Sequence, residues 1–219
     1  MEILNLYACL GGNRYKWDEV ATQAGIEINV TAVEIDHELA YLYKKRFPID
    51  KVIVTDAHEY LLNNFSKFDF IWSSPPCPSH SRARFARKET TAPVFPDLKL
   101  YEEIIFLQNY FEGKFLVENV IPYYQPLIEA KKRGRHLYWC NFNLPTNLNE
   151  RHVEGIMESK DEVKKWCKFH DFNFYQYKGK QRIDKIARNL VDYEAGKTIF
   201  ETLLNIKKPI VNQLNFNYG

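Results

Sequence analysis

Cys77 is the residue of this chain whose setting best suits nucleophilic chemistry. It stands within a Pro-Pro-Cys-Pro run that directly follows residues 68–72, an apolar stretch typical of a buried strand. Prolines fix the backbone φ angle, so the thiol is expected to be held rigidly at the end of that strand. The cations of residues 79–88, which follow, would favour the thiolate, the reactive form of the side chain. The alternative is a buried structural cysteine in a proline-rich turn.

A glycine turn and two acids are placed as a nucleoside ligand would require. Gly11 and Gly12 follow the first predicted strand, and glycine lets a backbone approach a ligand closely. Their spacing does not match GxGxxG, so a dinucleotide is not favoured, and a plain turn is the alternative. Glu34 and Asp56 end the second and third predicted strands, where they are suited to accept hydrogen bonds from ribose hydroxyls and an adenine amino group. Each acid would otherwise cap the helix that follows it.

A third acid and two arginines complete the candidate catalytic side chains. Glu118 ends an apolar strand, where desolvation is expected to keep it protonated near neutrality, so that it could donate to a ring nitrogen. A cap or a salt-bridged acid is the alternative. Arg133 and Arg135 alternate just before another predicted strand. This spacing would place one guanidinium on a substrate and the other on a structural acid.

The composition bounds the class of protein. The 219 residues fit one α/β domain, or one domain with a small appendage. A content of 45% hydrophobic residues is ordinary for a globular core. No apolar run approaches the roughly 20 residues of a membrane span, and no secretory signal is expected. The four cysteines form no CxxC pair, so neither a metal site nor a disulfide framework is expected. We therefore expect a cytoplasmic protein without a membrane partner.

Positive charge is concentrated locally although the formal net charge is only +2, which by itself does not argue for nucleic acid. Three basic clusters stand out: Arg82, Arg84, Arg87 and Lys88; Lys131, Lys132, Arg133 and Arg135; and Lys178, Lys180, Arg182 and Lys185. Such runs are usually solvated surface. Two of them adjoin candidate catalytic segments, which favours a phosphate-binding face.

Strand and helix patterns alternate along the first two thirds of the chain. The predicted strands are residues 3–8, 29–35, 52–55, 68–72, 115–118 and 136–142, and the predicted helices are 16–24, 37–47, 59–65 and 98–111. Alternation of this kind predicts an α/β fold with a doubly wound, mostly parallel, Rossmann-like sheet. Ligands of such sheets bind outside the carboxyl ends of the strands.

The pattern changes in the last third of the chain. Residues 1–142 are expected to form the catalytic and cofactor-binding core. Residues 143–180 are polar and aromatic without clear periodicity, which predicts a short insertion. Residues 181–206 resume a helical pattern and are expected to be a C-terminal helix that returns to the core. The Asn-rich residues 207–219 are expected to be an irregular tail.

Seven short motifs, in this order, resemble those of the cytosine-C5 DNA methyltransferases, most closely the small phage and bacterial members. They lie at residues 7–13, 33–36, 55–57, 73–81, 116–120, 133–142 and 188–196. The resemblance implies an S-adenosylmethionine-dependent methyltransferase fold in which residues 143–180 are a reduced target-recognition region. Three positions depart from the usual motifs: Cys9 and Arg188 stand where glycine is usual, and Lys131 stands where glutamine is usual.

The resemblance also implies the site residues. The implied catalytic residues are Cys77, Glu118, Arg135, Arg133 and Asn119. The implied contacts of S-adenosylmethionine are Tyr7, Ala8, Leu10, Gly11, Gly12, Glu34, Ile35, Asp56, Ala57, Ser74, Pro76, Asn189 and Val191. The implied contacts of nucleic acid are Ser79, Ser81, Arg82, Arg84 and Arg87.

The implied activity is transfer of a methyl group from S-adenosylmethionine to carbon 5 of a flipped-out cytosine in DNA, through a covalent cysteine adduct. Double-stranded DNA would be the partner, a cognate restriction endonuclease is a further candidate, and no metal is implied. Three alternatives stay open. They are the same reaction on RNA (tRNA) cytosine, a non-catalytic DNA-binding module on the same fold, and a small-molecule methyltransferase.

Overall fold

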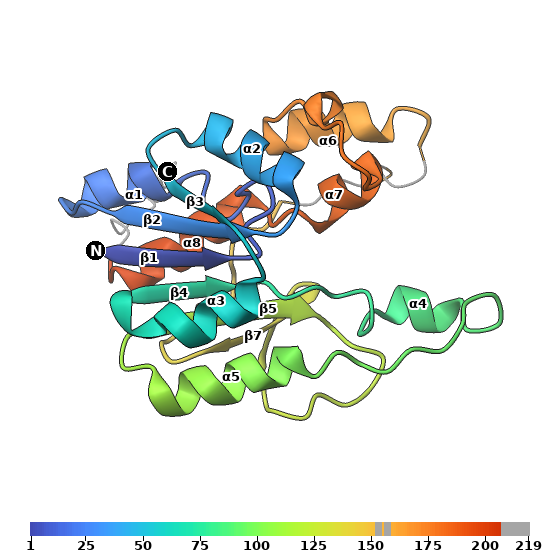
Figure 1. Cartoon of the computed structure of the whole chain (residues 1–219), viewed down its shortest axis with the longest axis horizontal. Coiled ribbons are helices and arrows are strands. Elements are labelled where there is room, and N and C mark those ends of the chain that lie inside the picture. The colour runs from blue at the N-terminus through green and yellow to red at the C-terminus, as the bar shows by residue number, and fades with distance from the viewer. Residues whose placement is uncertain (152–154, 156–158, 207–219) are drawn as a thin grey trace, which may run out of the picture.

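A seven-stranded sheet forms the centre of the protein, as the computed structural model shows (Figure 1). The structure describes residues 1–151, 155 and 159–206. The strands are β1 (Glu2–Leu6), β2 (Asn29–Glu34), β3 (Lys51–Val54), β4 (Phe70–Ser73), β5 (Lys114–Val120), β6 (Lys131–Arg133) and β7 (His136–Cys140). Their order across the sheet is β3-β2-β1-β4-β5-β7-β6. Strands β1 to β5 are parallel, whereas β7 runs antiparallel to both β5 and β6.

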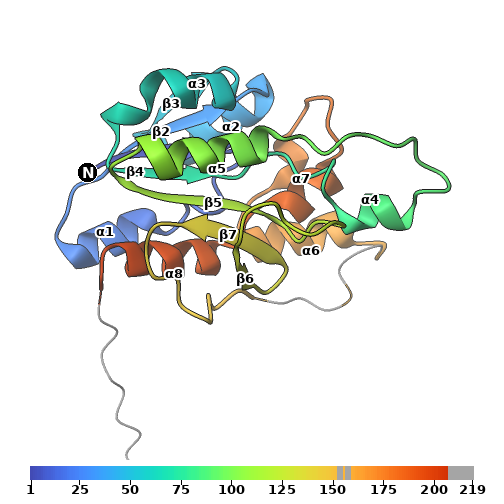
Figure 2. The same ribbon diagram turned by 90° about the horizontal axis from the view of Figure 1, so that it is seen from below.

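Helices cover both faces of the sheet. They are α1 (Trp17–Ala24), α2 (His37–Arg46), α3 (Ala57–Asn64), α4 (Arg82–Ala86), α5 (Lys99–Tyr110), α6 (Glu162–His170), α7 (Ile183–Asn189) and α8 (Tyr193–Leu203), with short 3-10 turns η1 (Phe65–Lys67) and η2 (Phe174–Gln176). Figure 2 shows α3 and α5 on one side of the sheet and α1 and α8 on the other. The molecule is therefore a three-layer α/β structure.

The two faces of the sheet carry separate apolar clusters. Leu4 and Leu6 of β1 pack with Ile104 of α5, whereas Ile3 packs with Trp17 of α1. This division follows from the strand geometry, in which successive side chains point to opposite faces. Burial on both faces is the reason why the central parallel strands read as almost continuous apolar runs.

Local sequence signals begin and end helices α1 and α2. The side chain of Asp36 caps α2 by accepting the backbone N–H groups of Glu38 and Leu39. Helix α2 ends before Pro48, whose ring excludes the helical conformation of the preceding residue. Gly25 ends α1 with φ 66°, a left-handed conformation that glycine adopts without a steric penalty.

The predicted doubly wound, mostly parallel sheet is confirmed. The last long predicted strand turns out to be antiparallel, because β6 and β7 form a hairpin beside β5. Strand β6 and helices α4 and α6 have no counterpart in the prediction, since elements of three to nine residues contain few repeats of any period. Residues 181–206 contain two helices, α7 and α8, instead of one. The predicted tail, 207–219, lies outside the described residues.

The described part of the chain contains no helix that is both long and apolar enough to cross a bilayer.

Close backbone contacts join residues 191–196 to the loop after β1. A Cβ atom at Gly12 would lie 2.2 Å from the carbonyl oxygen of Val191, and one at Gly196 would lie 2.3 Å from that of Asn13. Both distances are far below van der Waals contact, so only glycine fits at these positions. The segments that resemble the first and the last methyltransferase motif are thereby brought together.

Replacing Gly196 by alanine tests this contact. In an unobstructed helix the change would stabilise the fold by about 1 kcal/mol, because alanine is the better helix former. Here the added methyl group would displace the backbone of Asn13, and we expect the free energy of unfolding to fall by about 1–3 kcal/mol, as at other overpacked sites. Urea denaturation of the two proteins measures the difference. A more stable Gly196→Ala variant would contradict the close approach.

Candidate active site

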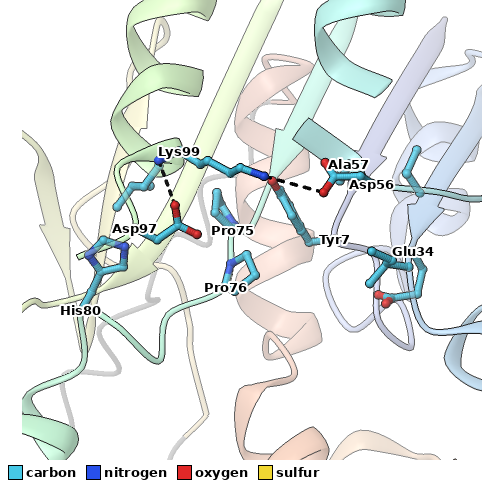
Figure 3. Close-up of a pocket in the computed structure, with 12 residues that line it drawn as sticks. Tyr7, Glu34, Asp56, Ala57, Pro75, Pro76, His80, Asp97 and Lys99 are labelled. Atoms are coloured by element: carbon cyan, nitrogen blue, oxygen red, sulfur yellow. Dashed lines mark hydrogen bonds and ion pairs between the residues drawn. The ribbon is translucent and has the colours of Figure 1, made fainter. Parts of the chain in front are cut away.

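Two adjoining cavities lie at the carboxyl edge of the parallel strands. The first, of about 190 Å³, is bounded by the ends of β1, β2 and β3 and by the start of α5 (Figure 3). The second, of about 400 Å³, is bounded by the ends of β1, β4 and β5, the β6–β7 hairpin and the α7–α8 junction. Tyr7, Pro75 and Pro76 line both cavities. A ligand with two ends could therefore occupy both at once.

Glu34 ends β2 and presents a buried carboxylate to the first cavity (Figure 3). Its two oxygens accept the backbone N–H groups of Cys9 at 2.8 Å and of Asp36 at 2.9 Å. Burial raises the pKa of Glu34 in spite of these hydrogen bonds. Each carboxylate oxygen has a second lone pair, so Glu34 can still accept a hydrogen bond from a ligand hydroxyl.

Asp56 caps α3 and also lines the first cavity (Figure 3). Its Oδ1 accepts the N–H of Glu59 at 3.1 Å, and its Oδ2 lies 3.8 Å from Nζ of Lys99. The hydrogen bond from Glu59 holds the pKa of Asp56 below its ordinary value, and Lys99 acts in the same direction. The capping role and the ligand role are therefore compatible: the cap fixes the carboxylate at the cavity wall.

Tyr7 is anchored by a buried acid that the sequence analysis missed. Its hydroxyl donates to Glu103 of α5, which also accepts the hydroxyl of Ser73 at 2.6 Å and lies 3.1 Å from Nδ1 of His58. The contact with Glu103 raises the pKa of His58. Tyr7 has φ 55°, an uncommon conformation for this residue type, and the buried bonds of Glu103 hold it there. The available signal was an acid on the apolar face of a predicted helix.

Cys77 lines the second cavity from a turn that is held on two sides. The N–H groups of His80 and Ser81 donate to its carbonyl oxygen at 3.0 and 3.1 Å. From the neighbouring strand, the buried side-chain amide of Asn119 donates to the carbonyl oxygen of Pro75 at 3.0 Å. Strand β5 thereby fixes the turn that carries the thiol.

The electrostatic environment of Cys77 differs from the expectation. Burial, followed by the negative charge of Glu118, raises the pKa of the Cys77 thiol above its ordinary value. The nearby arginines do not offset this shift, and Arg82 and Arg84 donate instead to backbone carbonyl oxygens at 3.1 and 2.7 Å. The expectation that these cations favour the thiolate in the free protein is wrong.

Glu118 and Arg135 face the second cavity together with Cys77. The Glu118 residue is 7% exposed, and its carboxylate lies 3.5 Å from Nε2 of His136. The guanidinium of Arg135 is exposed and has no ion pair or hydrogen bond to any described residue. A thiol, a carboxyl and a cation that has no side-chain partner among the described residues therefore line one cavity.

Arg133 has a different environment from Arg135. Its guanidinium donates to the carbonyl oxygens of Leu144, at 3.0 Å, and Pro145. The structural acid expected for one of the two arginines is thus replaced by backbone carbonyl groups. Arg133 ties the segment after β7 to the hairpin and lines neither cavity.

The loop after β1 is shaped mainly by packing. Gly11 has φ 67°, and a Cβ atom there would lie 2.4 Å from the ring of Phe47. Cys9 has φ 47°, within the region that favours glycine, which is a physical reason for glycine to be usual at this position. Leu10 is fully buried, and neither Leu10 nor Gly11 lines the two cavities.

The other predicted cofactor residues lie at the cavities. The first cavity also contacts Ile35 and Ala57, and the second also contacts Ala8, Gly12, Ser74, Asn189 and Val191. The lining residues that were not predicted as site residues include His80, Asp97, Lys99 and Leu100 in the first cavity and His136, Gln181 and Arg188 in the second. Position was the available signal for His80 and His136, since each lies within three residues of a candidate catalytic side chain.

Residues 79–97, the basic arm, project from the sheet and contain α4 (Figure 1). The arm carries all the predicted nucleic-acid contacts, which are Ser79, Ser81, Arg82, Arg84 and Arg87. Ser81 caps α4 and Ser79 accepts the N–H of Asp97 at 3.0 Å. Phe85 stacks on Tyr123 with ring centroids 5.0 Å apart. These contacts order the arm and leave Arg87 at its exposed surface.

The fold is that of the methyltransferases. The Entamoeba histolytica methyltransferase EhMeth matches with a TM-score of 0.54 and 11% identity over 95% of this chain and 99% of that one. Residues 1–126, more than half of the chain, match the family described as C-5 cytosine-specific DNA methylase, and the chain belongs to that family.

Two further solved structures show partial similarity. Spodoptera frugiperda DNMT2 matches at 24% identity with a TM-score of 0.38, over 54% of this chain and 35% of that one. A putative DNA modification methyltransferase encoded within an Escherichia coli prophage matches at 23% identity with a TM-score of 0.37, over 57% of this chain and 33% of that one. The chain thus spans about a third of the length of these two structures. A search of curated proteins found no significant match.

The pH dependence of Cys77 alkylation tests the arrangement of the thiol and Glu118. Because burial and Glu118 raise the pKa of Cys77, we expect its alkylation by iodoacetamide to increase only above the pH range of an ordinary thiol. Removing the negative charge in Glu118→Gln should move the profile to lower pH, by part of the shift only, since burial remains. Peptide mass spectrometry separates Cys77 from the other three cysteines. A profile that Glu118→Gln leaves unchanged would rule out the proximity.

Proposed function

We propose that this protein transfers a methyl group from S-adenosylmethionine to carbon 5 of a cytosine in double-stranded DNA, through a covalent bond between Cys77 and the ring. One observation carries the proposal. Cys77, Glu118 and Arg135 line a single cavity, and that cavity adjoins a second one lined by Glu34 and Asp56. Membership of the C-5 cytosine-specific DNA methylase family supports the same reaction.

The hydrogen-bond acceptors of the first cavity fit the nucleoside part of S-adenosylmethionine, which supplies an electrophilic methyl group on a sulfonium. Glu34 would accept from the ribose hydroxyls and Asp56 from the adenine amino group. Ile35 would lie against the adenine, with Tyr7 near it at the wall that the two cavities share. The amino-acid end would then extend into the second cavity, toward the α7–α8 junction.

The second cavity contains the groups that the reaction on cytosine needs. The Cys77 thiol loses its proton to water, and its sulfur bonds to ring carbon 6 while the ring double bond shifts toward nitrogen 3. Glu118 donates a proton to nitrogen 3, and Arg135 binds the ring carbonyl oxygen and stabilises the charge. Carbon 5 can then take the methyl group. Carbon 5 then loses its proton to water, and the Cys77 thiolate is expelled. The nitrogen-3 proton returns to Glu118, and the ring is aromatic again.

The reacting carbon atoms of cytosine are inaccessible inside a duplex. The base must leave the stack before Cys77 can reach it, at a cost of about a few kcal/mol. The basic arm begins two residues after Cys77 and projects away from the sheet (Figure 1). We propose that its arginines bind phosphate groups and so offset part of that cost.

A mechanism-based trap tests the covalent step. DNA that contains 5-fluorocytosine should crosslink to the protein in the presence of S-adenosylmethionine, because fluorine at carbon 5 cannot leave as a proton does. Cys77→Ala should form no crosslink and should lower methyl transfer by more than about 1000-fold, with cofactor binding retained. Cys140→Ala, which removes a thiol outside the two cavities, is the matched control.

The same assay with RNA of the same sequence identifies the nucleic acid. Crosslinking of RNA but not DNA would replace the DNA substrate by RNA. Absence of a crosslink to either, from a protein that binds the cofactor, would overturn the proposed function.

Salt dependence of DNA binding tests the basic arm. A combined Arg82→Ala, Arg84→Ala and Arg87→Ala variant should show a shallower dependence of log K on log salt, by about 0.9 for each phosphate that the arm no longer neutralises. Lys51 begins β3, at the amino ends of the parallel strands and away from the arm, so Lys51→Ala should keep the wild-type slope. An unchanged slope in the triple variant would argue against phosphate binding by the arm.

A further inference from the structure

We infer that His136 is a positioning residue for Glu118, and that Glu150 in turn positions His136. This inference rests on the proposed function, in which Glu118 acts on ring nitrogen 3. His136 lies with Nε2 3.5 Å from the Glu118 carboxylate and with Nδ1 3.8 Å from that of Glu150. The three side chains thus form a row that leads from the second cavity to the segment after β7.

The sheet places His136 beside Glu118. In the antiparallel pairing of β5 with β7, Glu118 lies opposite Tyr138 and Val120 lies opposite His136. His136 is therefore the diagonal neighbour of Glu118 on the same face of the sheet, within reach of a long side chain. Both residues line the second cavity together with Cys77.

Glu118 has few other partners. No described residue donates a hydrogen bond to its carboxylate, and His136 is the one basic side chain described within 4.0 Å of it. A carboxyl group this buried is costly to leave without a polar partner. The Nε2–H of His136 can meet that need and restrict the carboxyl to the orientation that faces the cavity.

Glu150 belongs to a well-anchored segment. On one side of it, the Asn149 side chain donates to the hydroxyl of Thr198 at 3.0 Å. On the other side, the N–H of Arg151 donates to Asp192 at 2.7 Å. These bonds attach the segment to α8 and to the turn before it.

The turn between β6 and β7 leaves room for this carboxylate. A Cβ atom at Gly134 would lie 2.6 Å from Oε2 of Glu150, so the carboxylate packs directly on the glycine. The side chains of His136 and Glu150 are 19% and 15% exposed. The row is thus largely shielded from solvent. Electrostatic contacts in such a place are stronger than at a surface.

Loss of the row should affect the chemical step more than binding. Neither the basic arm nor the first cavity, which are proposed to bind phosphate groups and the nucleoside of the cofactor, includes His136. A carboxyl that is free to turn away from the ring weakens an interaction made in the transition state, so kcat should fall while KM changes little.

The test compares two substitutions of His136 in the full chain. His136→Leu removes the N–H donor, and kcat for cytosine methylation should fall by about 100-fold, the scale of a misplaced catalytic group. His136→Gln keeps a side-chain N–H donor, and we expect it to restore kcat to within about 10-fold of wild type. His37→Gln, exposed and outside both cavities, is the control histidine and should match wild type.

Three outcomes decide between the proposals. If wild type methylates cytosine and His136→Leu keeps its kcat, or if Leu and Gln lower kcat equally, the role of His136 is overturned and the proposed function stands. If wild type methylates no cytosine, both are overturned. If His136→Leu does not fold by circular dichroism, Glu150→Gln takes its place: a lower kcat at unchanged KM supports the row, and an unchanged kcat overturns it.

Discussion

The parallel pairing of β4 with β5 is the constraint on which the site depends. Its register places Ser73 opposite Val117, so the chain leaves β4 toward Cys77 beside the point where β5 presents Glu118. The bond from Asn119 to the carbonyl oxygen of Pro75 then closes the gap between the two strand ends. The thiol and the carboxyl are thereby held by backbone and buried hydrogen bonds of one rigid sheet, which is how a reacting geometry is kept accurate.

The proximity of Glu118 also affects the protonation of the Cys77 thiol. A negative charge on Glu118 raises the pKa of the Cys77 thiol. A proton on Glu118 would remove that charge, so the form of Glu118 that can donate to a ring nitrogen is also the form that makes the thiolate easier to reach. Burial of the thiol raises its pKa further and is the larger of the two causes.

The features that sequence could predict are those that a few adjacent residues encode. Strands buried on both faces read as apolar runs, and their alternation with helices predicted the sheet that carries Glu34, Asp56 and Glu118. Features made by contacts between distant segments could not be read in this way. The antiparallel β7 depends on a three-residue partner strand, and the bonds of Arg133 depend on where residues 144 and 145 return. The same limit explains the wrong expectation for Cys77: nearness of cations in sequence did not fix where their guanidinium groups would bind.

The short segment after β7 is structurally continuous with the catalytic core. Arg133 attaches Leu144, near the start of this segment, to the β6–β7 hairpin. Arg151, at its end, binds Asp192 at the start of α8. Helix α8 in turn packs on the loop after β1 through Gly196, with no space for a larger side chain. A displacement of this segment would therefore shift the hairpin that carries Arg135 and the loop that lines the second cavity. If this segment contacts DNA, binding and the placement of the catalytic groups are mechanically linked, because the intervening contacts are close-packed and cannot deform independently.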